Sequence, residues 1–352
     1  MPQEFQSPSV AVAAAAALSA YTLLSGLLLR YPTLLHRRKR RHFAAAHISH
    51  RGGAAELAEN TMEAFEAAVS QHRTHMLELD CQITRDGQVV VAHDNDLNRL
   101  CAKSGRIDQI NYAELPPIRR DLAVTFEPGL IVTAGKDRRI PLLAEVLVAF
   151  PNVPLNIDIK EDRPDLLEAV RQLVVQHGRQ DTVVWGNRSY RVVRQLRAME
   201  PRVSTLFSMR SILFTVLLYA TGLLPFVPIS DDFFEPPMLS ALLELEPFAA
   251  AYPNWFGRCL VRIFDILMMS PKLIRHLHER GVPTYVWVLN QEQHFLKAFQ
   301  AGCEGVMTDR PELLRRFIDS NPDCLDAYRR ACDWVREDDL ERERLAGRGK
   351  MD

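Results

Sequence analysis

The sequence has few cysteines and almost no net charge, and it lacks one common hydrolase motif. Its six cysteines lie far apart, and no two have the spacing of a metal-binding or redox pair. We interpret them as reduced thiols, which agrees with a domain that faces the cytoplasm. The formal net charge of −1 predicts no nucleic-acid partner, and the sequence predicts no protein partner. The lack of a Gly-x-Ser-x-Gly elbow argues against Ser-His-Asp chemistry.

A long uncharged run lies near the N-terminus. From Phe5 to Leu29 the chain carries no charge, and roughly 20 apolar residues suffice to cross a bilayer. Glu4 precedes the run, whereas a basic cluster follows it, formed by Arg30, Arg37, Arg38, Lys39, Arg40 and Arg41. A secretory signal carries its positive charge before the apolar run. We therefore predict that residues 1–42 form an uncleaved single-pass membrane anchor and a basic juxtamembrane segment. The positive-inside rule then places the rest of the chain in the cytoplasm.

Two alternatives for the N-terminal run are a buried alanine-rich helix and a leader segment. If the run is an anchor, the basic cluster is expected to attract anionic lipid headgroups. Membrane lipids are therefore predicted partners.

A second uncharged run covers residues 211–230. It is interrupted by Gly222, Pro225 and Pro228, and the prolines would break a simple spanning helix. We expect this run to dip into the membrane interface or to line a groove through which lipid enters. A buried helix with a loop and a second span are the alternatives. Residues 321–352 form a charged C-terminal tail, in which a solvated helix is expected and to which we assign no function.

Between these ends, β-like runs alternate with helical patterns, which is typical of βα units and a parallel sheet. The expected strands are residues 44–50, 76–83, 89–93, 153–159, 182–185, 203–207, 284–289 and 305–308. Helices are expected over residues 165–177 and 271–280, each ending at a glycine, and a capping box at residues 60–63 opens another. Asp86-Gly87 predicts a tight hairpin turn. Residues 94–140 lack periodicity and are predicted to form an insertion.

Polar residues lie where the first two strands are expected to end. His50 and Arg51 follow the first strand, and Glu78 and Asp80 lie two apart on the second. Residues two apart in a strand face the same side, so both carboxylates would share one interior face. Two such charges are costly unless a cation joins them. Carboxylates suit hard ions, and we therefore predict a site for one divalent cation, Mg²⁺ or Ca²⁺.

Later strands add three further polar groups. His93 follows the hairpin, and Asp158 and Lys160 form another pair two residues apart. Together these residues suit a phosphodiester, because cations neutralise phosphoryl oxygens while one histidine takes a proton and the other gives one. Each residue also has a structural interpretation: a histidine that forms a hydrogen bond, a solvated strand face, or a surface ion pair. Their joint occurrence favours a catalytic site.

Several motifs occur in the order found in one enzyme family. They are His-Arg-Gly at 50–52, Glu-Asn-Thr at 59–61, Glu-Leu-Asp at 78–80, His-Asp at 93–94, Trp-Val-Leu-Asn at 287–290 and Gly-Val-Met-Thr-Asp-Arg-Pro at 305–311. Together they resemble the glycerophosphodiester phosphodiesterases over residues 44–320. The resemblance implies an α/β fold of the TIM (β/α)₈ barrel type over residues 43–320. It also implies that the insertion, residues 94–140, follows the second barrel strand.

The resemblance also implies a role for each candidate residue. The metal ligands would be Glu78, Asp80 and Asp158, although many family members have glutamate where this chain has Asp158. The acid–base pair would be His50 and His93. The substrate phosphate would be bound by Arg51 and Lys160. The supporting and pocket residues would be Glu59, Asn60, Trp287 and Asn290.

The N-terminal run and the apolar residues 223–228 resemble a narrower, membrane-attached branch with lysophospholipase D activity. The predicted substrate is therefore a lysophospholipid. One alternative is hydrolysis of soluble, deacylated glycerophosphodiesters. An alternative from another class is a non-catalytic lipid-binding barrel.

Overall fold

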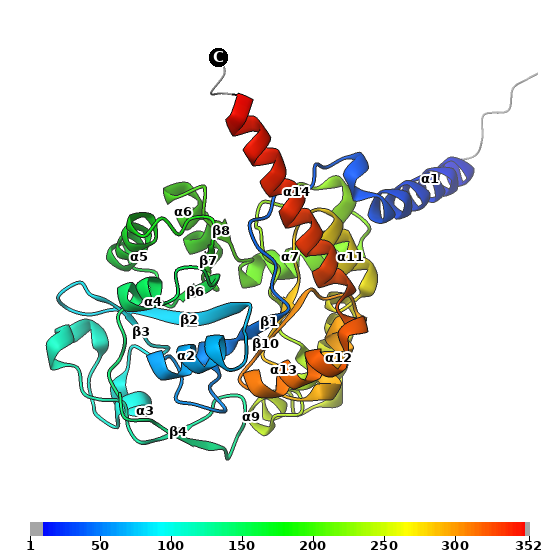
Figure 1. Ribbon diagram of the computed structural model, residues 1–352. Coiled ribbons are helices and arrows are strands. Elements are labelled where there is room, and N and C mark those ends of the chain that lie inside the picture. Colours follow the sequence, from blue (N-terminus) through cyan, green and yellow to red (C-terminus); the bar gives the residue numbers. More distant parts are fainter. Residues whose placement is uncertain (1–9, 349–352) are drawn as a thin grey trace, which may run out of the picture.

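The computed structural model describes residues 10–348, and its centre is a curled parallel sheet (Figure 1). Neighbouring strands follow the order β8-β7-β6-β2-β1-β10-β9. The strands are β1 (His47–Ser49), β2 (Met76–Ile83), β6 (Leu155–Ile159), β7 (Val183–Gly186), β8 (Ser204–Thr205), β9 (Tyr285–Val286) and β10 (Gly305–Thr308). An antiparallel strand, β3 (Val89–Val91), pairs with β2 through the hairpin predicted at Asp86-Gly87. The expected strand at residues 89–93 is therefore a hairpin arm and contributes no wall to the barrel.

Residues 233–237 complete the circuit between β8 and β9. Parallel bridges join Leu206 to Phe233, Phe234 to Thr284, and Pro237 to Trp287. The sequence analysis missed this strand because two prolines follow the two phenylalanines, and proline cannot donate a ladder hydrogen bond. With this segment in place, the predicted TIM (β/α)₈ barrel is confirmed.

Helices pack around the barrel, and those expected at residues 165–177 and 271–280 are present. They are α2 (Met62–Ser70), α4 (Leu143–Ala149), α5 (Pro164–Gln176), α6 (Tyr190–Met199), α7 (Met209–Ala220), α8 (Leu239–Leu242), α9 (Glu246–Ala250), α10 (Trp255–Met268), α11 (Pro271–Glu279), α12 (Glu292–Gln300) and α13 (Pro311–Ser320). Alternate residues of β2, Leu77 and Leu79, face outward and are fully buried beneath the helices. The residues between them therefore face the barrel interior.

The insertion at residues 94–140 forms its own small unit. It contains α3 (Leu97–Cys101), the one-turn helices η3 (Ile107–Gln109) and η4 (Tyr112–Glu114), and the antiparallel strands β4 (Asp121–Ala123) and β5 (Ile131–Thr133). Ile107, Ile118 and Leu122 contribute to its separate hydrophobic cluster. An ion pair between Glu127 and Arg310 fastens the β4–β5 turn to the end of β10.

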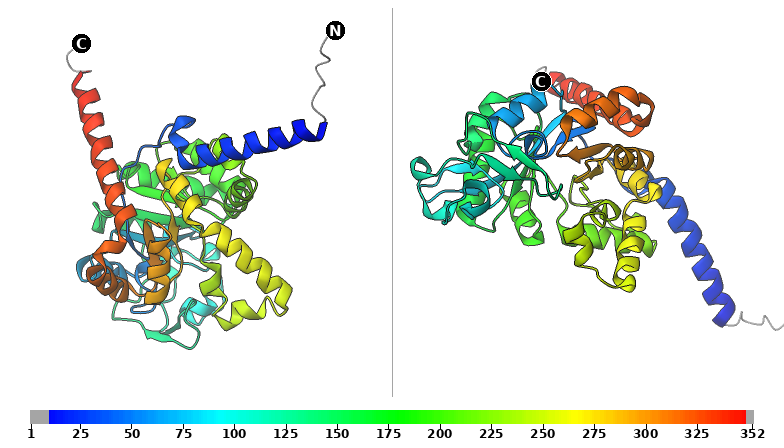
Figure 2. Two further views of the ribbon diagram at one scale, coloured as in Figure 1. Left: turned by 90° about the vertical axis from the view of Figure 1, so that its right-hand side faces the viewer. Right: turned by 90° about the horizontal axis from the view of Figure 1, so that it is seen from below.

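The N-terminal apolar run is one helix, α1 (Val10–Arg30), which projects from the barrel (Figures 1 and 2). By length and composition it is able to cross a membrane, with 21 residues and a mean hydropathy of 1.9. Its C-terminal half packs on the barrel: Ser25 donates to the carbonyl of Gly222 over 2.7 Å, and Tyr21 stacks on Phe226. Helix α1 therefore contacts the second apolar run directly. That run contains only the 12-residue α7 and the turn η5 (Leu224–Phe226), so α7 is too short for a second span.

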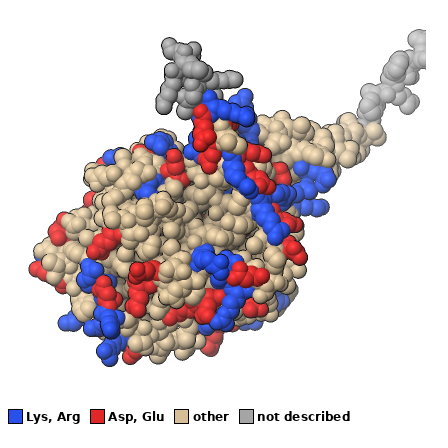
Figure 3. All heavy atoms as spheres, viewed as in Figure 1, with Lys and Arg blue, Asp and Glu red and all other residues tan. Residues whose placement is uncertain are grey.

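A basic linker, residues 31–43, joins α1 to the barrel and contains the turn η1 (Pro32–Leu34). Four of its charges are paired within the molecule. The pairs are Arg38 with Asp338, Lys39 with Asp232, Arg40 with Glu341, and Arg41 with the fully buried Glu304. Two of these acidic partners lie on α14 (Asp326–Arg348), which follows η6 (Pro322–Cys324). Basic and acidic side chains accordingly lie interleaved there (Figure 3). Four of the six basic residues of the cluster therefore form ion pairs within the molecule, while Arg30 and Arg37 are exposed. The attraction of the cluster to lipid headgroups stays a prediction.

Candidate active site

The turn η2 (His50–Gly52) after β1 places the first site residues at the barrel mouth. Arg51 has a φ of 51°, and Gly53 has a φ of 111°. A Cβ atom on Gly53 would lie 2.6 Å from Cγ of Pro311, so only glycine fits there. This tight turn directs the backbone N–H of Arg51 to Oε2 of Glu78, at 2.9 Å.

The predicted carboxylates meet across two neighbouring strands. In the parallel register of β2 and β6, Glu78 lies opposite Asn156 and Asp80 lies opposite Asp158. Nζ of Lys160 lies 2.6 Å from Oδ1 of Asp80 and 2.5 Å from Oδ2 of Asp158. The lysine ammonium therefore stands between these two carboxylates.

Two predicted residues hold Asp80 from the other side. Asn60 donates from Nδ2 to Oδ2 of Asp80 over 2.8 Å, and Nε of Arg51 lies 3.2 Å from the same oxygen. The predicted capping box is therefore corrected: Thr61 caps α2 by accepting from the backbone of Ala64, while the Asn60 side chain belongs to the site. Because Asn60 has a φ of 56°, its amide turns away from the helix.

Burial and crowding give the two β2 carboxylates opposite pKa shifts. Burial, reinforced by the charge of Asp80, raises the pKa of Glu78 to about 7. Burial acts on Asp80 in the same direction, but the charges of Lys160 and Arg51 outweigh it and hold the pKa of Asp80 well below its usual range. Glu78 thus lacks a full countercharge, and its surroundings favour the neutral form.

The donor set fits a divalent cation, although the side chains do not converge on one. Within residues 10–348, no three histidine, cysteine, aspartate or glutamate side chains form a cluster that could hold a metal. The Lys160 ammonium lies between Asp80 and Asp158. Three carboxyl groups, one of them with a raised pKa, nevertheless form an oxygen-rich environment with an excess of negative charge, which suits Mg²⁺ or Ca²⁺.

Each candidate histidine is held by a carboxylate. Nδ1 of His50 lies 2.6 Å from Oδ1 of Asp309, and Nδ1 of His93 lies 2.7 Å from Oδ1 of Asp94. Because a carboxylate accepts, each Nδ1 carries the proton and each Nε2 is left free to exchange one. The hydrogen bond from His93 also holds the pKa of Asp94 below its usual range.

The supporting residues Glu59 and Asn290 lie one layer behind these groups. Glu59 lies 3.3 Å from NH1 of Arg51 and 2.6 Å from NH2 of Arg99. Burial acts to raise the pKa of Glu59, but the charges of both arginines outweigh it and lower that pKa. Asn290 donates from Nδ2 to Oδ2 of Asp309 over 3.2 Å, so it holds the carboxylate that holds His50.

The mouth opens into a cavity of about 380 Å³. The predicted site residues that line it include both histidines, Arg51, Glu78, Asp158, Lys160 and Trp287. Phe126, from the insertion, packs edge-on against His50 and Trp287, with ring centroids at 5.6 and 6.5 Å. The opposite wall is apolar and includes Phe207 and Ile212. The cavity thus has a charged floor and an apolar side.

Sequence reasoning missed several residues of this site. Glu235 lies on the missed strand, and Asn156 donates to both of its carboxylate oxygens over 2.9 Å. Burial raises the pKa of Glu235 to about 8. Asp94 and Asp309 lay within recognised motifs but had received no role. Their positions directly after a histidine and after the last strand were the available signal.

A (β/α)₈ barrel whose mouth gathers paired carboxylates, cationic side chains and two braced histidines has the architecture of a phosphodiester hydrolase. The family model described as "Glycerophosphoryl diester phosphodiesterase family" matches residues 50–313. The chain belongs to this family, as the motifs predicted, and it is a phosphodiesterase.

Two human proteins and one solved structure illustrate what this chain is similar to. Lysophospholipase D GDPD1 of Homo sapiens is 47% identical over 302 residues, which cover 86% of this chain and 95% of that protein. Lysophospholipase D GDPD3 of Homo sapiens is 36% identical, over 87% of this chain and 95% of that protein. Among solved structures, a glycerophosphodiester phosphodiesterase from Agrobacterium tumefaciens covers 78% of this chain and 99% of its own, with a TM-score of 0.54 and 17% identity. That likeness supports the fold.

Proposed function

We propose that this phosphodiesterase is a metal-dependent lysophospholipase D. It would release the headgroup alcohol of a lysophospholipid and leave lysophosphatidic acid or cyclic phosphatidic acid. The observation that carries this proposal is a largely apolar groove that adjoins the charged cavity. Phe207 lines both, and the groove continues along α7 with Phe214 and Leu218. The two human relatives that are named lysophospholipase D support the same substrate class.

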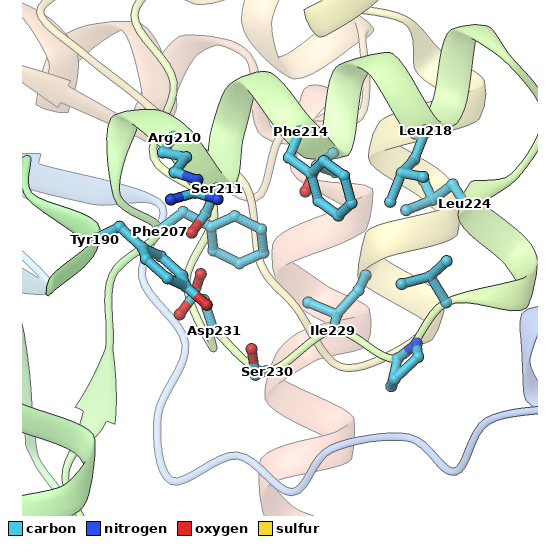
Figure 4. A pocket seen from close by; sticks show the side chains of 13 residues that line it. Tyr190, Phe207, Arg210, Ser211, Phe214, Leu218, Leu224, Ile229, Ser230 and Asp231 are labelled. Atoms are coloured by element: carbon cyan, nitrogen blue, oxygen red, sulfur yellow. The ribbon is translucent and has the colours of Figure 1, made fainter. Parts of the chain in front are cut away.

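The groove has a suitable form for part of one acyl chain. Its volume is about 210 Å³. Side chains from α7 face Ile229 across it, while polar groups gather at the end near Tyr190 and Arg210 (Figure 4). A single-chain lipid would therefore place its chain along α7 and its phosphate over the charged floor. This placement is the lipid-entry role expected for residues 211–230.

The phosphate would be bound by side chains of the floor. Glu78, Asp80 and Asp158 would hold one divalent cation, Mg²⁺ or Ca²⁺, which supplies charge neutralisation at the phosphoryl oxygens. Lys160 and Arg51 add positive charge beside the same oxygens. Lys160 serves in this way only after it exchanges its carboxylate partners for the phosphate.

The histidines would move the protons. Nε2 of one histidine takes the proton of the free glycerol 2-hydroxyl as that oxygen attacks phosphorus. The bond from phosphorus to the headgroup oxygen breaks, and Nε2 of the other histidine protonates the departing alcohol. Water then opens the cyclic phosphate, or the cyclic product departs. The carboxylate partners of the two Nδ1 atoms support these roles for Nε2 of His50 and Nε2 of His93.

We further propose that α1 anchors the enzyme in a membrane with the barrel on the cytoplasmic side. The length and composition of α1 support the anchor. The basic residues that follow α1 support the orientation, because cytoplasmic flanks are enriched in lysine and arginine.

The test is release of choline by the purified full chain. Lysophosphatidylcholine and glycerophosphocholine are compared with Mg²⁺, with Ca²⁺ and with a chelator, and Asp80→Ala is the matched inactive variant. Metal-dependent release from the lysolipid, lost in Asp80→Ala, is the expected result. Release from glycerophosphocholine alone would replace the proposal with hydrolysis of soluble diesters. Full activity in the presence of the chelator would refute the requirement for a divalent cation.

A further inference from the structure

Helix α10 exposes an apolar face that no other element covers within the described residues. The α10 outer face consists of Trp255, Phe256, Leu260, Ile263 and Ile266, which are 76%, 60%, 52%, 54% and 70% exposed. Phe256, Leu260 and Ile263 follow the spacing of one helical stripe. Scattered exposed hydrophobic residues are ordinary, but a continuous stripe with two aromatic rings indicates an interaction surface.

The helix itself is firmly built, so the exposed face is not a product of fraying. The Asn254 side chain caps its N-terminus by accepting from the backbone of Gly257 over 2.7 Å. On the inner side, Met268 is buried in one cluster with Ile212 and Val216 of α7. The outer face therefore contributes little to folding and is free to serve another purpose.

We propose that the α10 outer face lies in the interfacial region of the same bilayer that α1 enters. The apolar surface is continuous between the two helices, because α7 packs against α10 and exposes Leu213, Phe214 and Leu217. The segment after α7 also contacts α1, through Gly222 and Phe226. Both views in Figure 2 place α1 and α10 on the same side of the barrel.

The charges of α10 favour a lipid surface over a second copy of the chain. Arg258 and Arg262 are exposed beside the apolar stripe, whereas the one acidic residue of the helix, Asp265, is buried. An amphipathic helix with aromatic residues and arginines suits anionic headgroups. A symmetric contact between two α10 helices would bring like charges together.

The consequence for catalysis rests on the proposed lysophospholipase D function. With α1 and α10 both in the membrane, the α7 groove between them opens at the lipid surface. A lysolipid would then pass from the bilayer to the site without crossing water. The α10 outer face is thus a positioning surface for the groove.

The first test measures membrane contact without any reference to activity. The full chain is reconstituted in vesicles of phosphatidylcholine and phosphatidylglycerol, with and without bromine near the headgroup end of the acyl chains. Tryptophan quenching is compared among the native chain, Trp255→Phe and the matched control Trp334→Phe. Trp255 is one of four tryptophans, so bromine is expected to quench its share of the emission in the native chain and in the control. That share of the quenching is expected to be absent in Trp255→Phe. Equal quenching in all three would overturn the proposal. Emission from Trp255 that responds to protein density but not to bromine would identify a second copy and would also overturn it.

The second test separates the surface from the catalytic site. Leu260→Glu is compared with Val148→Glu, which alters a similarly exposed residue on α4. Leu260→Glu is expected to slow hydrolysis of vesicle-embedded lysophosphatidylcholine about tenfold. Hydrolysis of soluble glycerophosphocholine stays unchanged, and Val148→Glu changes neither rate. Equal loss on both substrates would overturn the surface role. An enzyme without lysolipid activity would contradict the proposed function, while the quenching result would still decide the membrane contact.

Discussion

Replacing Asp309 with asparagine tests the bracing of His50, because the local hydrogen bonds leave an amide no acceptable orientation. Oδ1 of Asp309 accepts from Nδ1 of His50 at 2.6 Å, and Oδ2 accepts from Nδ2 of Asn290 at 3.2 Å. Asn290 is unable to reverse without loss, since its Oδ1 already accepts from the backbone of Asp309 and from Thr308. The new amide would therefore face at least one of its two donors with an NH₂ group.

If the NH₂ group faces His50, the imidazole takes the opposite tautomer and Nε2 carries the proton. If it faces Asn290, two donors meet and the support of the side chain is lost. Losing such a partner costs about 10- to 100-fold where it orients a metal-bound histidine, and a wrong tautomer costs more. We expect kcat for Asp309→Asn to fall roughly 100-fold or more, with a much smaller change in KM.

The assay is steady-state choline release together with thermal unfolding. The double variant Asp309→Asn with Asn290→Asp restores complementary partners, because the aspartate accepts from the amide and the amide oxygen accepts from His50. It is expected to recover part of kcat. A single variant with native kcat, or one whose loss follows a lower Tm, would refute the bracing argument. A double variant that remains as slow as the single variant would refute the donor conflict.

Three further predictions concern the cation, the η2 turn and the linker. The pKa of Glu78 in the folded enzyme is about 7, above its ordinary 4.5, so the metal-free enzyme loses the stabilising contribution of Glu78 as pH rises through that range. Mg²⁺ binds the charged form of Glu78, so adding Mg²⁺ should raise Tm more at about pH 8 than at about pH 5. Equal increases in Tm at both pH values would exclude Glu78 as a ligand. Gly53→Ala should lower the free energy of unfolding by about 1–3 kcal/mol in denaturant titration, because of the contact with Pro311 and the positive φ. An unchanged denaturant midpoint would show that the η2 turn relaxes to accommodate the methyl group. Arg41→Met should lower the free energy of unfolding by about 3–5 kcal/mol in the same titration, because the buried Glu304 loses its countercharge. A loss below about 1 kcal/mol would show that this pair contributes no more than a surface ion pair.

Local pattern was sufficient for the barrel and for much of its mouth. The two-residue spacing of Glu78 and Asp80 correctly predicted a shared interior face, because strand geometry alone decides it. The parallel register with β6 then brings Asp158 beside Asp80. Strand 233–237 escaped prediction because its prolines oppose strand propensity, and the circuit of the barrel overrides that preference. Glu235 was missed with it.

Contacts between distant parts of the chain were beyond any local pattern. His50 and Asp309 are 259 positions apart, and a sequence spacing of that size carries no geometric information. The internal ion pairs of the basic cluster after α1 were missed for the same reason: Asp338 on α14, the partner of Arg38, lies 300 positions away in the chain. A run of like charge reports its own sign but not the position of its countercharges.

The paired linker also determines how this enzyme would meet its substrate. A flexible tether would let the barrel sample a wide volume of water above the membrane, and bulk substrate concentration would govern the rate. The ion pairs of Arg38, Lys39 and Arg41, together with the packing of α1 on the barrel, replace that tether with a rigid mount. In a membrane, such an enzyme searches in two dimensions. On the proposed lysophospholipase D function, its turnover would follow the mole fraction of lysolipid in the bilayer, and diluting the vesicles in buffer would leave its rate per enzyme unchanged.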